Sequence, residues 1–344
     1  MFVNEGLARI KTGSQSLPKG PGKAGMGFYN SSQKLNRDLA VMAVSGLRPR
    51  HYLDAFGGTG IRGIRVFLET GVETFISEKS RLSCNLIREN ISTNECSIPL
   101  YNGDFSTLIR EVEFDFIDVD PYGSVVPYLD DALTYLRKPG YLGITATDLS
   151  ALTGSVPRTN LRRYGCSLTV DYYLHEAGIR NLLGYIARRA AAFDLFVKPI
   201  LSFWKSHFYR VIVRVGKGAR DADSMIRQVG MIDKGNFSRT TMGVEGPIWK
   251  GNIEDRELID GFKIPDFLAE HELQEMMNLL MHEDEMLLFF DTRDVFHGYP
   301  AISSLHAAMK SIEEKLGKTV YRTHFSDSGL KVKASLQDVI AAVS

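Results

Sequence analysis

Five short apolar runs, set among stretches with helical periodicity, constrain the fold of this chain more than any other feature. The runs are rich in β-branched and aromatic residues and cover residues 51–56, 74–77, 99–102, 114–119 and 141–145. Helical stretches cover residues 36–47, 60–70, 80–94 and 124–136. Strands that alternate with helices in this way pair in parallel and are covered by helices on both faces. The sequence therefore predicts an α/β fold.

The pattern changes after residue 147. A helical stretch at about residues 171–193 precedes two β-rich runs, 197–204 and 208–215, which only a few polar residues separate. A parallel pair needs a crossover of a dozen or more residues, so these two runs must be antiparallel. A parallel sheet completed by an antiparallel hairpin is the plan of the class I methyltransferases with their Rossmann-like sheet, although other α/β enzymes also carry antiparallel edges.

The length of the chain predicts two domains. At roughly 150 residues per domain, 344 residues suffice for two cores. Residues 216–223 are rich in glycine and charge, so we predict one domain over residues 1–218 and a smaller α+β domain over residues 219–344. In the second domain the pattern is weaker and predicts helices at 264–286 and 303–316 and a β-like run at 319–325. We expect the first 25 residues or so to form a flexible or substrate-wrapping arm.

Composition favours the cytoplasm. Hydrophobic residues make up 44% of the chain, and no run reaches the ~18 apolar residues of a membrane helix. The first 19 residues lack the apolar centre of a signal peptide. Cys84, Cys96 and Cys166 form no CxxC pair, which argues against a disulfide framework and a cysteine-rich zinc site. We therefore expect no membrane contact and no metal.

The zero formal net charge hides a difference between the two predicted domains. Residues 1–218 hold 27 basic and 20 acidic side chains, whereas residues 219–344 hold 14 and 21. Basic residues are densest between residues 157 and 220. Such an excess is usually a solvated surface, but it is also what a nucleic-acid-binding face looks like.

A glycine-rich turn, LDAFGGTGIRGIR at residues 53–65, joins a strand end to a helix start. Gly58, Gly60 and Gly63 satisfy the GxGxxG pattern, and Glu78 follows about twenty residues later, as a dinucleotide site requires. The same pattern also fits a tight turn without a ligand. Asp54 lies at the mouth of the turn, where it would repel a pyrophosphate. S-adenosylmethionine has no phosphate and carries a sulfonium cation, so this rim favours it.

Two further acidic residues, Asp104 and Asp120, also follow strand ends. Open α/β sheets bind ligands at the carboxyl ends of their strands, so these residues should meet Asp54 and Glu78 at one edge. Glu78 would accept hydrogen bonds from ribose hydroxyls and Asp104 one from the adenine amino group. Each acid could instead be a capping or turn residue.

The sequence DVDPYG at residues 118–123 follows an apolar strand directly. The lone pair of an exocyclic amine on a base is delocalised into the ring, which makes the amine a poor nucleophile. A carboxylate and a backbone carbonyl held side by side can accept both N–H bonds and aim the lone pair at a methyl group. Asp120 would supply the carboxylate, Pro121 would fix the strand-end carbonyls and Tyr122 would stack on the base. A β-turn with proline at its second position is the simpler alternative.

These motifs and others resemble the tRNA (guanine-26, N2)-dimethyltransferase family, archaeal type. The matching segments follow one another over nearly the whole chain: FYNSSQKLNRDLAV (28–41), LDAFGGTGIRGIR, DVDPYGSVVPYLDDAL (118–133), GITATD (143–148), HEAGIRNLLG (175–184), GPIW (246–249) and YRTHFSDSGLK (321–331). The resemblance implies transfer of one or two methyl groups from S-adenosylmethionine to N2 of a tRNA guanine where the D-arm meets the anticodon arm. It also makes residues 219–344 a tRNA-associated domain.

The resemblance also implies roles for single residues. Asp120 takes the catalytic position, and Phe28 and Tyr122 flank the extruded guanine, although Phe28 and Tyr29 alone would also fit a hydrophobic staple before a helix. A guanidinium suits the methionine carboxylate, so Arg37 is the candidate there. The predicted cofactor contacts are Arg37, Asp54, Gly58, Gly60, Arg62, Glu78, Asp104 and Phe105. The predicted RNA contacts are Arg158, Arg162, Arg163, Arg188 and Arg189, and we expect one further contact from Arg322, His324, Lys331 and Lys333. The acidic run at residues 283–285 is expected to face solvent.

The chain departs from the family pattern in a few places. Residues 219–344 hold no cysteine, so we predict no zinc there, and Tyr122 and Glu78 stand where relatives often have Phe and Asp. A methyltransferase for another exocyclic amine, such as adenine N6 or a glutamine amide, would use the same tetrad. A nicotinamide dehydrogenase and a non-catalytic RNA-binding module are two further functions that the sequence allows. The sequence leaves the oligomeric state open, and a monomer is compatible with it.

Overall fold

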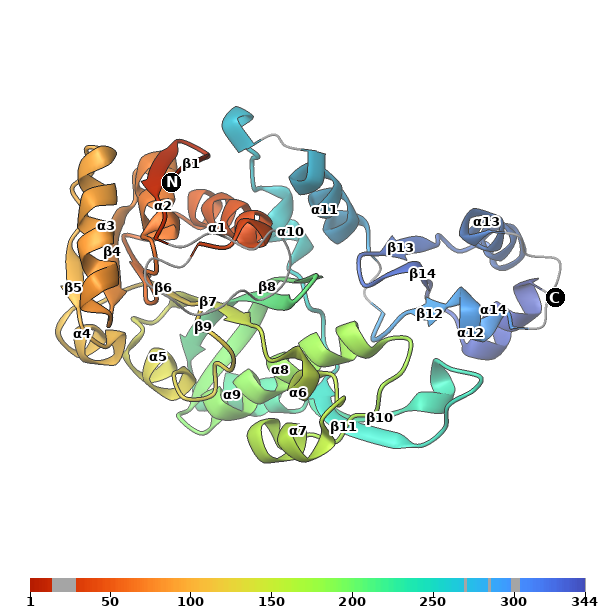
Figure 1. Ribbon diagram of the computed structural model, residues 1–344. Coiled ribbons are helices and arrows are strands. Elements are labelled where there is room, and N and C mark those ends of the chain that lie inside the picture. Colours follow the sequence, from red (N-terminus) through yellow and green to blue (C-terminus); the bar gives the residue numbers. More distant parts are fainter. Residues whose placement is uncertain (14–28, 269–270, 284–285, 298–303, 344) are drawn as a thin grey trace.

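A seven-stranded sheet forms the centre of the molecule (Figure 1). The computed structural model describes residues 1–13, 29–268, 271–283, 286–297 and 304–343. The strand order is β5-β4-β3-β6-β7-β9-β8, and β9 runs antiparallel to both of its neighbours while the other pairs are parallel. This arrangement confirms the predicted parallel sheet with a terminal hairpin. The strands are β3 (His51–Asp54), β4 (Glu73–Glu78), β5 (Leu100–Asn102), β6 (Phe116–Val119), β7 (Gly140–Ala146), β8 (Leu195–Lys205) and β9 (Phe208–Lys217).

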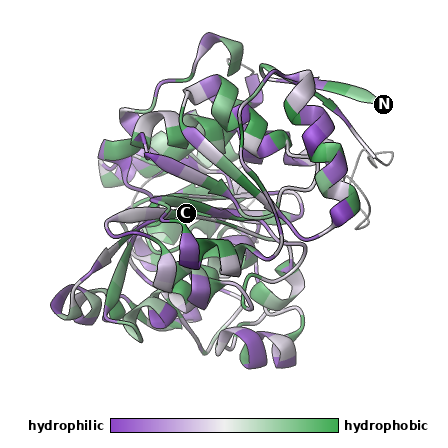
Figure 2. Cartoon of the chain, turned by 90° about the vertical axis from the view of Figure 1, so that its left-hand side faces the viewer, coloured by the Kyte–Doolittle hydropathy of each residue, from purple (hydrophilic) through white to green (hydrophobic). Residues whose placement is uncertain are grey.

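Helices cover both faces of this sheet because its central strands bury side chains on both sides. In β3, Tyr52 packs in the core beneath α1, whereas Leu53 packs in the core beneath α5 and α8. Hydrophobic and hydrophilic residues alternate around the covering helices, as amphipathic helices require (Figure 2). The helices on one face are α1 (Lys34–Leu47), α2 (Ile61–Thr70) and α3 (Arg81–Thr93), and those on the other are α4 (Phe105–Glu111), α5 (Leu129–Tyr135) and α8 (Leu174–Ala191). Shorter segments are η1 (Ser31–Gln33), α6 (Leu149–Leu152) and α7 (Pro157–Tyr164).

The N-terminal residues form a hairpin of β1 (Phe2–Glu5) and β2 (Ala8–Lys11). Ala8 and Ile10 are buried with side chains of α2 and α3. The side chain of Asn90 on α3 accepts from Lys11 N at 2.7 Å and donates to Lys11 O at 3.0 Å. Residues 1–13 are therefore not a flexible arm, while a substrate-wrapping role for them stays a prediction. The rest of the predicted arm, from residue 14 to about residue 25, lies outside the described residues.

The chain after β9 forms two parts. The first part packs on the central sheet and its helices: α9 (Ala219–Ile226), β10 (Val229–Asp233), η2 (Lys234–Asn236), β11 (Val244–Trp249), α10 (Arg256–Asp260), η3 (Asp266–Leu268) and α11 (His271–His282). The second part has a core of its own: β12 (Phe290–Asp291), α12 (Thr292–Val295), α13 (Leu305–Leu316), β13 (Tyr321–Thr323), β14 (Ser326–Lys331) and α14 (Leu336–Val343). The division predicted after Gly218 thus falls at the end of β9, but the separate core begins only near β12 (Figure 1).

A buried charge network joins these C-terminal elements to α8. The Arg180 Nη2 and Lys331 Nζ atoms donate to Glu176 Oε1 at 2.8 and 2.9 Å, and all three side chains are at most 2% exposed. His324 Nδ1 lies 2.6 Å from Glu283 Oε1, and Lys331 Nζ lies 3.7 Å from Glu283 Oε2. We call these five residues the junction cluster. His324, Lys331 and Glu283 are thus buried, so the predicted RNA contact of His324 and Lys331 and the predicted solvent exposure of Glu283 are wrong. The other two residues of the predicted acidic run, 284 and 285, lie outside the described residues.

Among the helices that the structure describes, none has the length and apolar character needed to cross a membrane.

Candidate active site

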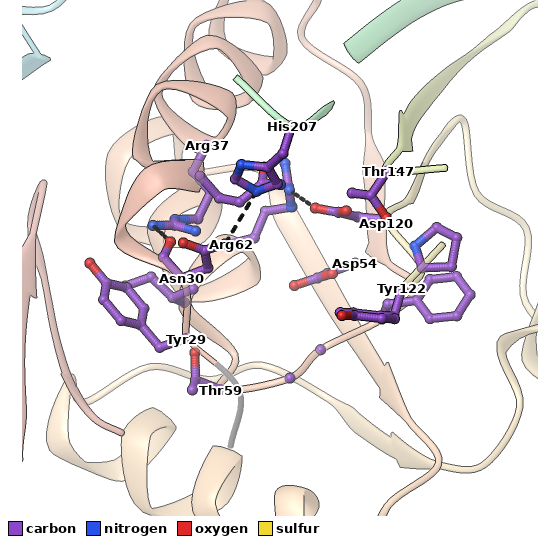
Figure 3. A pocket seen from close by; sticks show the side chains of 16 residues that line it. Tyr29, Asn30, Arg37, Asp54, Thr59, Arg62, Asp120, Tyr122, Thr147 and His207 are labelled. Atoms are coloured by element: carbon purple, nitrogen blue, oxygen red, sulfur yellow. Dashed lines mark hydrogen bonds and ion pairs between the residues drawn. The ribbon is translucent and has the colours of Figure 1, made fainter. Parts of the chain in front are cut away.

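A cavity of about 120 Å³ lies at the edge of the sheet where the parallel strands β3, β6 and β7 end (Figure 3). Its walls come from the turn after β3, the loop after β6, the segment that enters α1 and the turn between β8 and β9. It is lined by Tyr29, Asn30, Gln33, Arg37, Asp54, Phe56, Gly57, Gly58, Thr59, Ile61, Arg62, Asp120, Pro121, Tyr122, Thr147 and His207. The cavity therefore brings together the glycine turn and the Asp-Pro-Tyr-Gly loop, as the sequence predicted.

The glycine turn between β3 and α2 depends on backbone geometry and close packing. Gly58 and Gly60 have φ angles of 57° and 81°, a region that favours glycine. A Cβ atom on Gly63 would lie 2.6 Å from the Cγ1 atom of Ile76, so only glycine lets α2 approach β4 this closely. These glycines are required by the fold itself, with or without a ligand.

Glu78 ends β4 and holds the glycine turn from the side. Its Oε2 accepts from Gly58 N at 2.9 Å, and its Oε1 accepts from Ser80 N at 2.7 Å. Each oxygen keeps acceptor capacity for a further partner. Glu78 lies next to the cavity but does not line it.

Five charged residues form what we call the cavity cluster: Asp54, Arg62, Asp118, Asp120 and Arg210. Asp54, Arg62 and Asp120 line the cavity, and all five except the half-buried Asp120 are buried. Arg210 binds both oxygens of Asp118 at 2.6 and 2.7 Å, and Tyr52 donates to Asp118 at 3.0 Å. Arg62 pairs with Asp120 Oδ2 and lies 3.6 Å from Asp118. Burial alone would raise the pKa of Asp118, but Arg210 and Arg62 outweigh it and lower the pKa to about 2.

Asp54 differs from the other two carboxylates because a backbone amide donates to it. Gly63 N lies 3.1 Å from Asp54 Oδ2 in this hydrogen bond. Burial, with Asp118 and Asp120 nearby, raises the pKa of Asp54 to about 7 in spite of Arg62. Three carboxylates face two guanidinium groups, so an ionised Asp54 leaves an excess negative charge beside the cavity.

The wall on the α1 side is organised by Glu5 of the N-terminal hairpin. Arg37 Nε and Nη2 each donate to Glu5 at 2.6 Å, Tyr29 donates its hydroxyl to Glu5 at 2.9 Å and Arg65 Nη1 donates at 2.7 Å. Burial would raise the pKa of Glu5, but Arg37 and Arg65 outweigh it and lower the pKa to about 2. Arg37, a predicted cofactor contact, lines the cavity, although Glu5 occupies the Nε–Nη2 edge of its guanidinium group.

The loop Asp120–Gly123 forms the opposite wall. Asp120 follows the last residue of β6, Pro121 is buried, and the Tyr122 side chain is 59% exposed at the mouth of the cavity. Gly123 has a φ of 93° and donates its backbone N–H to Thr147 Oγ1 at 2.8 Å. The loop therefore presents a carboxylate and an accessible ring from one short segment.

Asp104 and Phe105 lie on the same edge but do not line the cavity. Asp104 caps α4, because its Oδ1 accepts from Ser106 N at 3.0 Å, and its Oδ2 pairs with Lys79 at 2.6 Å. Phe105 is 2% exposed and packs on Phe56 with ring centroids 5.5 Å apart. The capping role thus describes Asp104 in this structure. Phe28 lies outside the described residues.

The five predicted RNA contacts divide into two groups. Arg158, Arg162 and Arg163 are exposed on α7, and Arg163 also pairs with Asp148 at 3.1 Å. Arg188 Nη2 donates to Tyr164 O, and Arg188 Nη1 donates to Gly165 O at 3.4 Å, so this side chain caps the C-terminus of α7 from α8. Arg189 Nε donates to Asp130 on α5 at 2.8 Å.

Several cavity residues were not found by sequence reasoning: Tyr29, Asn30, Gln33, Thr147 and His207. Asn30 caps η1 through its Oδ1, which accepts from Ser32 N at 3.0 Å, so its Nδ2 is the donor toward His207 Nε2 at 3.3 Å. The segments FYNSSQKLNRDLAV and GITATD include four of the five, but their sequence pattern gives no sign that they face a cavity. His207 lies in a hairpin turn without any motif.

Fold and site together define a class I methyltransferase. The strands β3 to β7 are parallel, β9 is antiparallel to β7, and acidic residues lie at the ends of β3, β4 and β6. Residues 9–344 match the model of the family described as N2,N2-dimethylguanosine tRNA methyltransferase. The chain belongs to this family, which excludes a nicotinamide dehydrogenase.

Individual relatives agree with this assignment. The tRNA (guanine(26)-N(2))-dimethyltransferase of Thermoplasma volcanium is 42% identical over 98% of this chain and 97% of its own length. The enzyme of the same name from Thermoplasma acidophilum is 41% identical over 97% and 95%. The solved complex of Trm1 from Pyrococcus horikoshii with S-adenosyl-L-methionine is 31% identical, covers 99% of both chains and superposes with a TM-score of 0.87.

Proposed function

We propose that this protein transfers one or two methyl groups from S-adenosylmethionine to the exocyclic N2 of guanine 26 in tRNA. The observation that carries the proposal is the position of Asp120, which lines one cavity with the glycine turn in a chain that matches this family from residue 9 to residue 344. A tRNA substrate fits the cytoplasmic location that the sequence favours.

The cavity suits the reacting end of S-adenosylmethionine. When bound, this molecule supplies an electrophilic methyl group on a sulfonium cation. An ionised Asp54 gives the cavity cluster one negative charge more than its two arginines balance, which favours a cation and disfavours a pyrophosphate. Binding pockets for small molecules usually measure about 300–1,000 Å³, so we assign the adenosine half to the open rim outside the cavity.

On this rim, Glu78 would accept from the ribose hydroxyls beside its two backbone donors, Asp104 would face the adenine amino group and Phe105 would support the ring through Phe56. Asp104 would have to accept this bond in addition to those from Ser106 and Lys79. For the methionine carboxylate, Arg37 would use Nη1, because Nε and Nη2 face Glu5.

Asp120 has the role of aligning the target amine. Arg62 pairs with Asp120 Oδ2, so we assign Oδ1 and a backbone carbonyl of the Pro121 segment to the two N–H bonds of guanine N2. Both acceptors draw the nitrogen toward a tetrahedral shape and direct its lone pair into the cavity. After transfer, the amine proton leaves to Asp120 or to solvent.

Tyr122 would stack on the extruded guanine. Extrusion of a base costs a few kcal/mol, and stacking on an aromatic ring returns about 1–3 kcal/mol. The exposed Tyr122 ring at the cavity mouth is suited to this role, with Phe28 as the proposed second side. We assign tRNA phosphates to the exposed Arg158, Arg162 and Arg163 and to the half-buried Arg189, whereas Arg188 caps the end of α7.

The test is a methylation assay with unmodified tRNA transcripts and methyl-labelled S-adenosylmethionine. We expect label in N2-methylated guanosine with the wild-type protein, and none when guanine 26 is replaced by adenine. Label in the adenine transcript, or none in any tRNA despite measurable cofactor binding, would overturn the proposal.

A further inference from the structure

We propose that Thr147 and Tyr164 are positioning residues that clamp the base-binding loop Asp120–Ser124 from two sides, and that Tyr164 connects this loop to the arginine surface of α7. The inference rests on the proposed function. Neither residue has the chemistry to transfer a methyl group. Both act by holding the loop that carries Asp120 and Tyr122.

The first side of the clamp is the end of β7. Thr147 Oγ1 accepts from Gly123 N at 2.8 Å, and Thr147 N donates to Gly123 O at 3.1 Å. Both backbone polar groups of Gly123 are thereby fixed to one residue. Because Gly123 has a φ of 93°, its conformation is one that few other residues adopt, and it ends the turn that carries Asp120 and Tyr122. Thr147 thus holds the loop at its only glycine.

The second side of the clamp is the last residue of α7. Tyr164 is fully buried, and its hydroxyl lies 2.9 Å from Ser124 Oγ and 2.9 and 2.8 Å from the two oxygens of Asp148. A carboxylate accepts only, so the single Tyr164 proton is donated to Asp148, and Ser124 must donate to Tyr164. Burial and Asp148 raise the pKa of Tyr164 far above its ordinary value, which keeps that proton in place. The bonds therefore have one direction, from Ser124 through Tyr164 to Asp148.

Asp148 also connects these hydrogen bonds to the exposed arginines of α7. Arg163 Nη1 pairs with Asp148 Oδ2 at 3.1 Å, with Arg163 42% and Asp148 10% exposed. Arg163, Arg162 and Arg158 share α7 with Tyr164, and Arg188 caps the same helix end. A phosphate bound on α7 is therefore connected to Tyr122 through Tyr164 and Ser124 and to Gly123 through the neighbouring Thr147. Binding of the tRNA body and placement of the target base share one rigid support.

The experiment compares Thr147→Val with Thr147→Ser in single-turnover methylation at saturating cofactor and tRNA. Valine has the shape of threonine but accepts no bond from Gly123, whereas serine keeps the hydroxyl. We expect Thr147→Val to lower the single-turnover rate about 10- to 100-fold, the range for small misplacements of reacting groups, and Thr147→Ser to restore it to within about threefold. The dissociation constant of the cofactor should stay unchanged. Thr153→Val, which removes another buried threonine hydroxyl nearby, is the matched control and should behave as the wild type.

A second measurement separates positioning from general loss of structure. A transcript with 2-aminopurine at position 26 reports stacking by quenching of its fluorescence. Tyr164→Phe and Thr147→Val should both weaken quenching on binding while the melting temperature with cofactor stays within a few degrees of wild type. Equal rates and quenching for Thr147→Val and the wild type would overturn the inference, as would an equal loss with Thr147→Ser. Failure of the wild type itself to methylate guanine 26 would instead overturn the proposed function.

Discussion

The junction cluster and the cavity cluster each contain five ionisable residues, but they differ in how well their own side chains balance their charge. In the junction cluster, the carboxylates of Glu176 and Glu283 face the cations of Arg180 and Lys331, and burial together with Glu283 raises the pKa of the neighbouring Glu254. In the cavity cluster, three carboxylates face two arginines, and the pKa of Asp54 is about 7. The junction cluster is balanced by the protein alone. The cavity cluster reaches balance only with a proton or another cation, which is what a site for a cationic cofactor requires.

The strongest way to separate the two clusters is to change Asp120. We expect Asp120→Asn to lower the single-turnover methylation rate about 10²- to 10⁴-fold, because an amide is a weaker acceptor for the amine N–H groups. The unfolding free energy should fall by less than the about 3–5 kcal/mol of a broken fully buried pair, because Asp120 is 21% exposed and Arg62 stays 3.6 Å from Asp118. Single-turnover kinetics with calorimetric measurement of cofactor binding check this, and a variant with normal turnover would remove Asp120 from the mechanism.

The converse change in the junction cluster is Lys331→Met, which should affect stability and not chemistry. It leaves two buried carboxylates with less compensation, and breaking a buried pair typically costs about 3–5 kcal/mol. Denaturant unfolding measures this, and adding Glu176→Gln should recover part of the loss. Lys310→Met, which removes an exposed pair, is the control and should cost less than about 1 kcal/mol. A similar loss in both lysine variants would show that the junction cluster is not special.

The affinity for the cofactor should depend on pH through Asp54. The sulfonium cation favours the ionised form of Asp54, so below pH 7 the proton of Asp54 must leave when the cofactor binds. We expect the affinity for S-adenosylmethionine to rise with pH and level off above about 7, with a slope of at most about tenfold per unit below it. Titrations between pH 5 and 8 measure this. The Asp54→Asn variant should bind S-adenosylmethionine more weakly at pH 8, with an affinity that does not change with pH. A wild-type affinity that does not change with pH would contradict a titrating Asp54 in the cavity cluster.

The same group gives the stability of the ligand-free protein a pH dependence of the opposite sign. The pKa of Asp54 rises from 3.8 to about 7 on folding, so its contribution is fully present below pH 4 and is lost as the pH rises to 7. Relative to Asp54→Asn, the wild type should therefore lose unfolding free energy over this window. Unfolding curves at several pH values, without cofactor, test the sign.

The smallest effect is expected on the α7 surface, whose exposed arginines belong to neither cluster. Replacing Arg158, Arg162 or Arg163 singly by Ala should weaken tRNA binding at low salt and lower the slope of log affinity against log salt by about 1. Binding assays at several salt concentrations measure it. Arg220→Ala, an exposed arginine near β9, should leave the slope unchanged, and an equal effect there would argue against a defined surface on α7.

Local pattern was sufficient to predict the sheet, because its strands are short apolar runs bounded by turns, and the terminal hairpin followed from the few residues between β8 and β9. The same is true of the glycine turn and of Asp120, which lie within single motifs. Glu5 could not be found, because its partners Arg37 and Arg65 lie 32 and 60 residues away and only the folded chain brings them together.

The errors in the C-terminal part have the same origin. His324, Lys331 and Glu283 have the composition of a solvated surface, and the burial of Lys331 depends on Glu176 of α8, more than a hundred residues earlier in the chain. A charged side chain is buried only where a partner is present, and the sequence identifies the charge but not the partner. For Arg188, likewise, the carbonyl groups at the end of α7 determine its role.

The cavity also depends on the complete sheet. Its lining runs from Tyr29, ahead of α1, to His207, in the turn of the last hairpin, so a partly folded chain has no such cavity. A ligand bound only by the finished sheet shifts the folding equilibrium toward it, by about 2.7 kcal/mol at a concentration one hundred times its dissociation constant. The methyl donor is therefore also expected to act as a folding ligand that favours molecules whose terminal hairpin has joined the sheet.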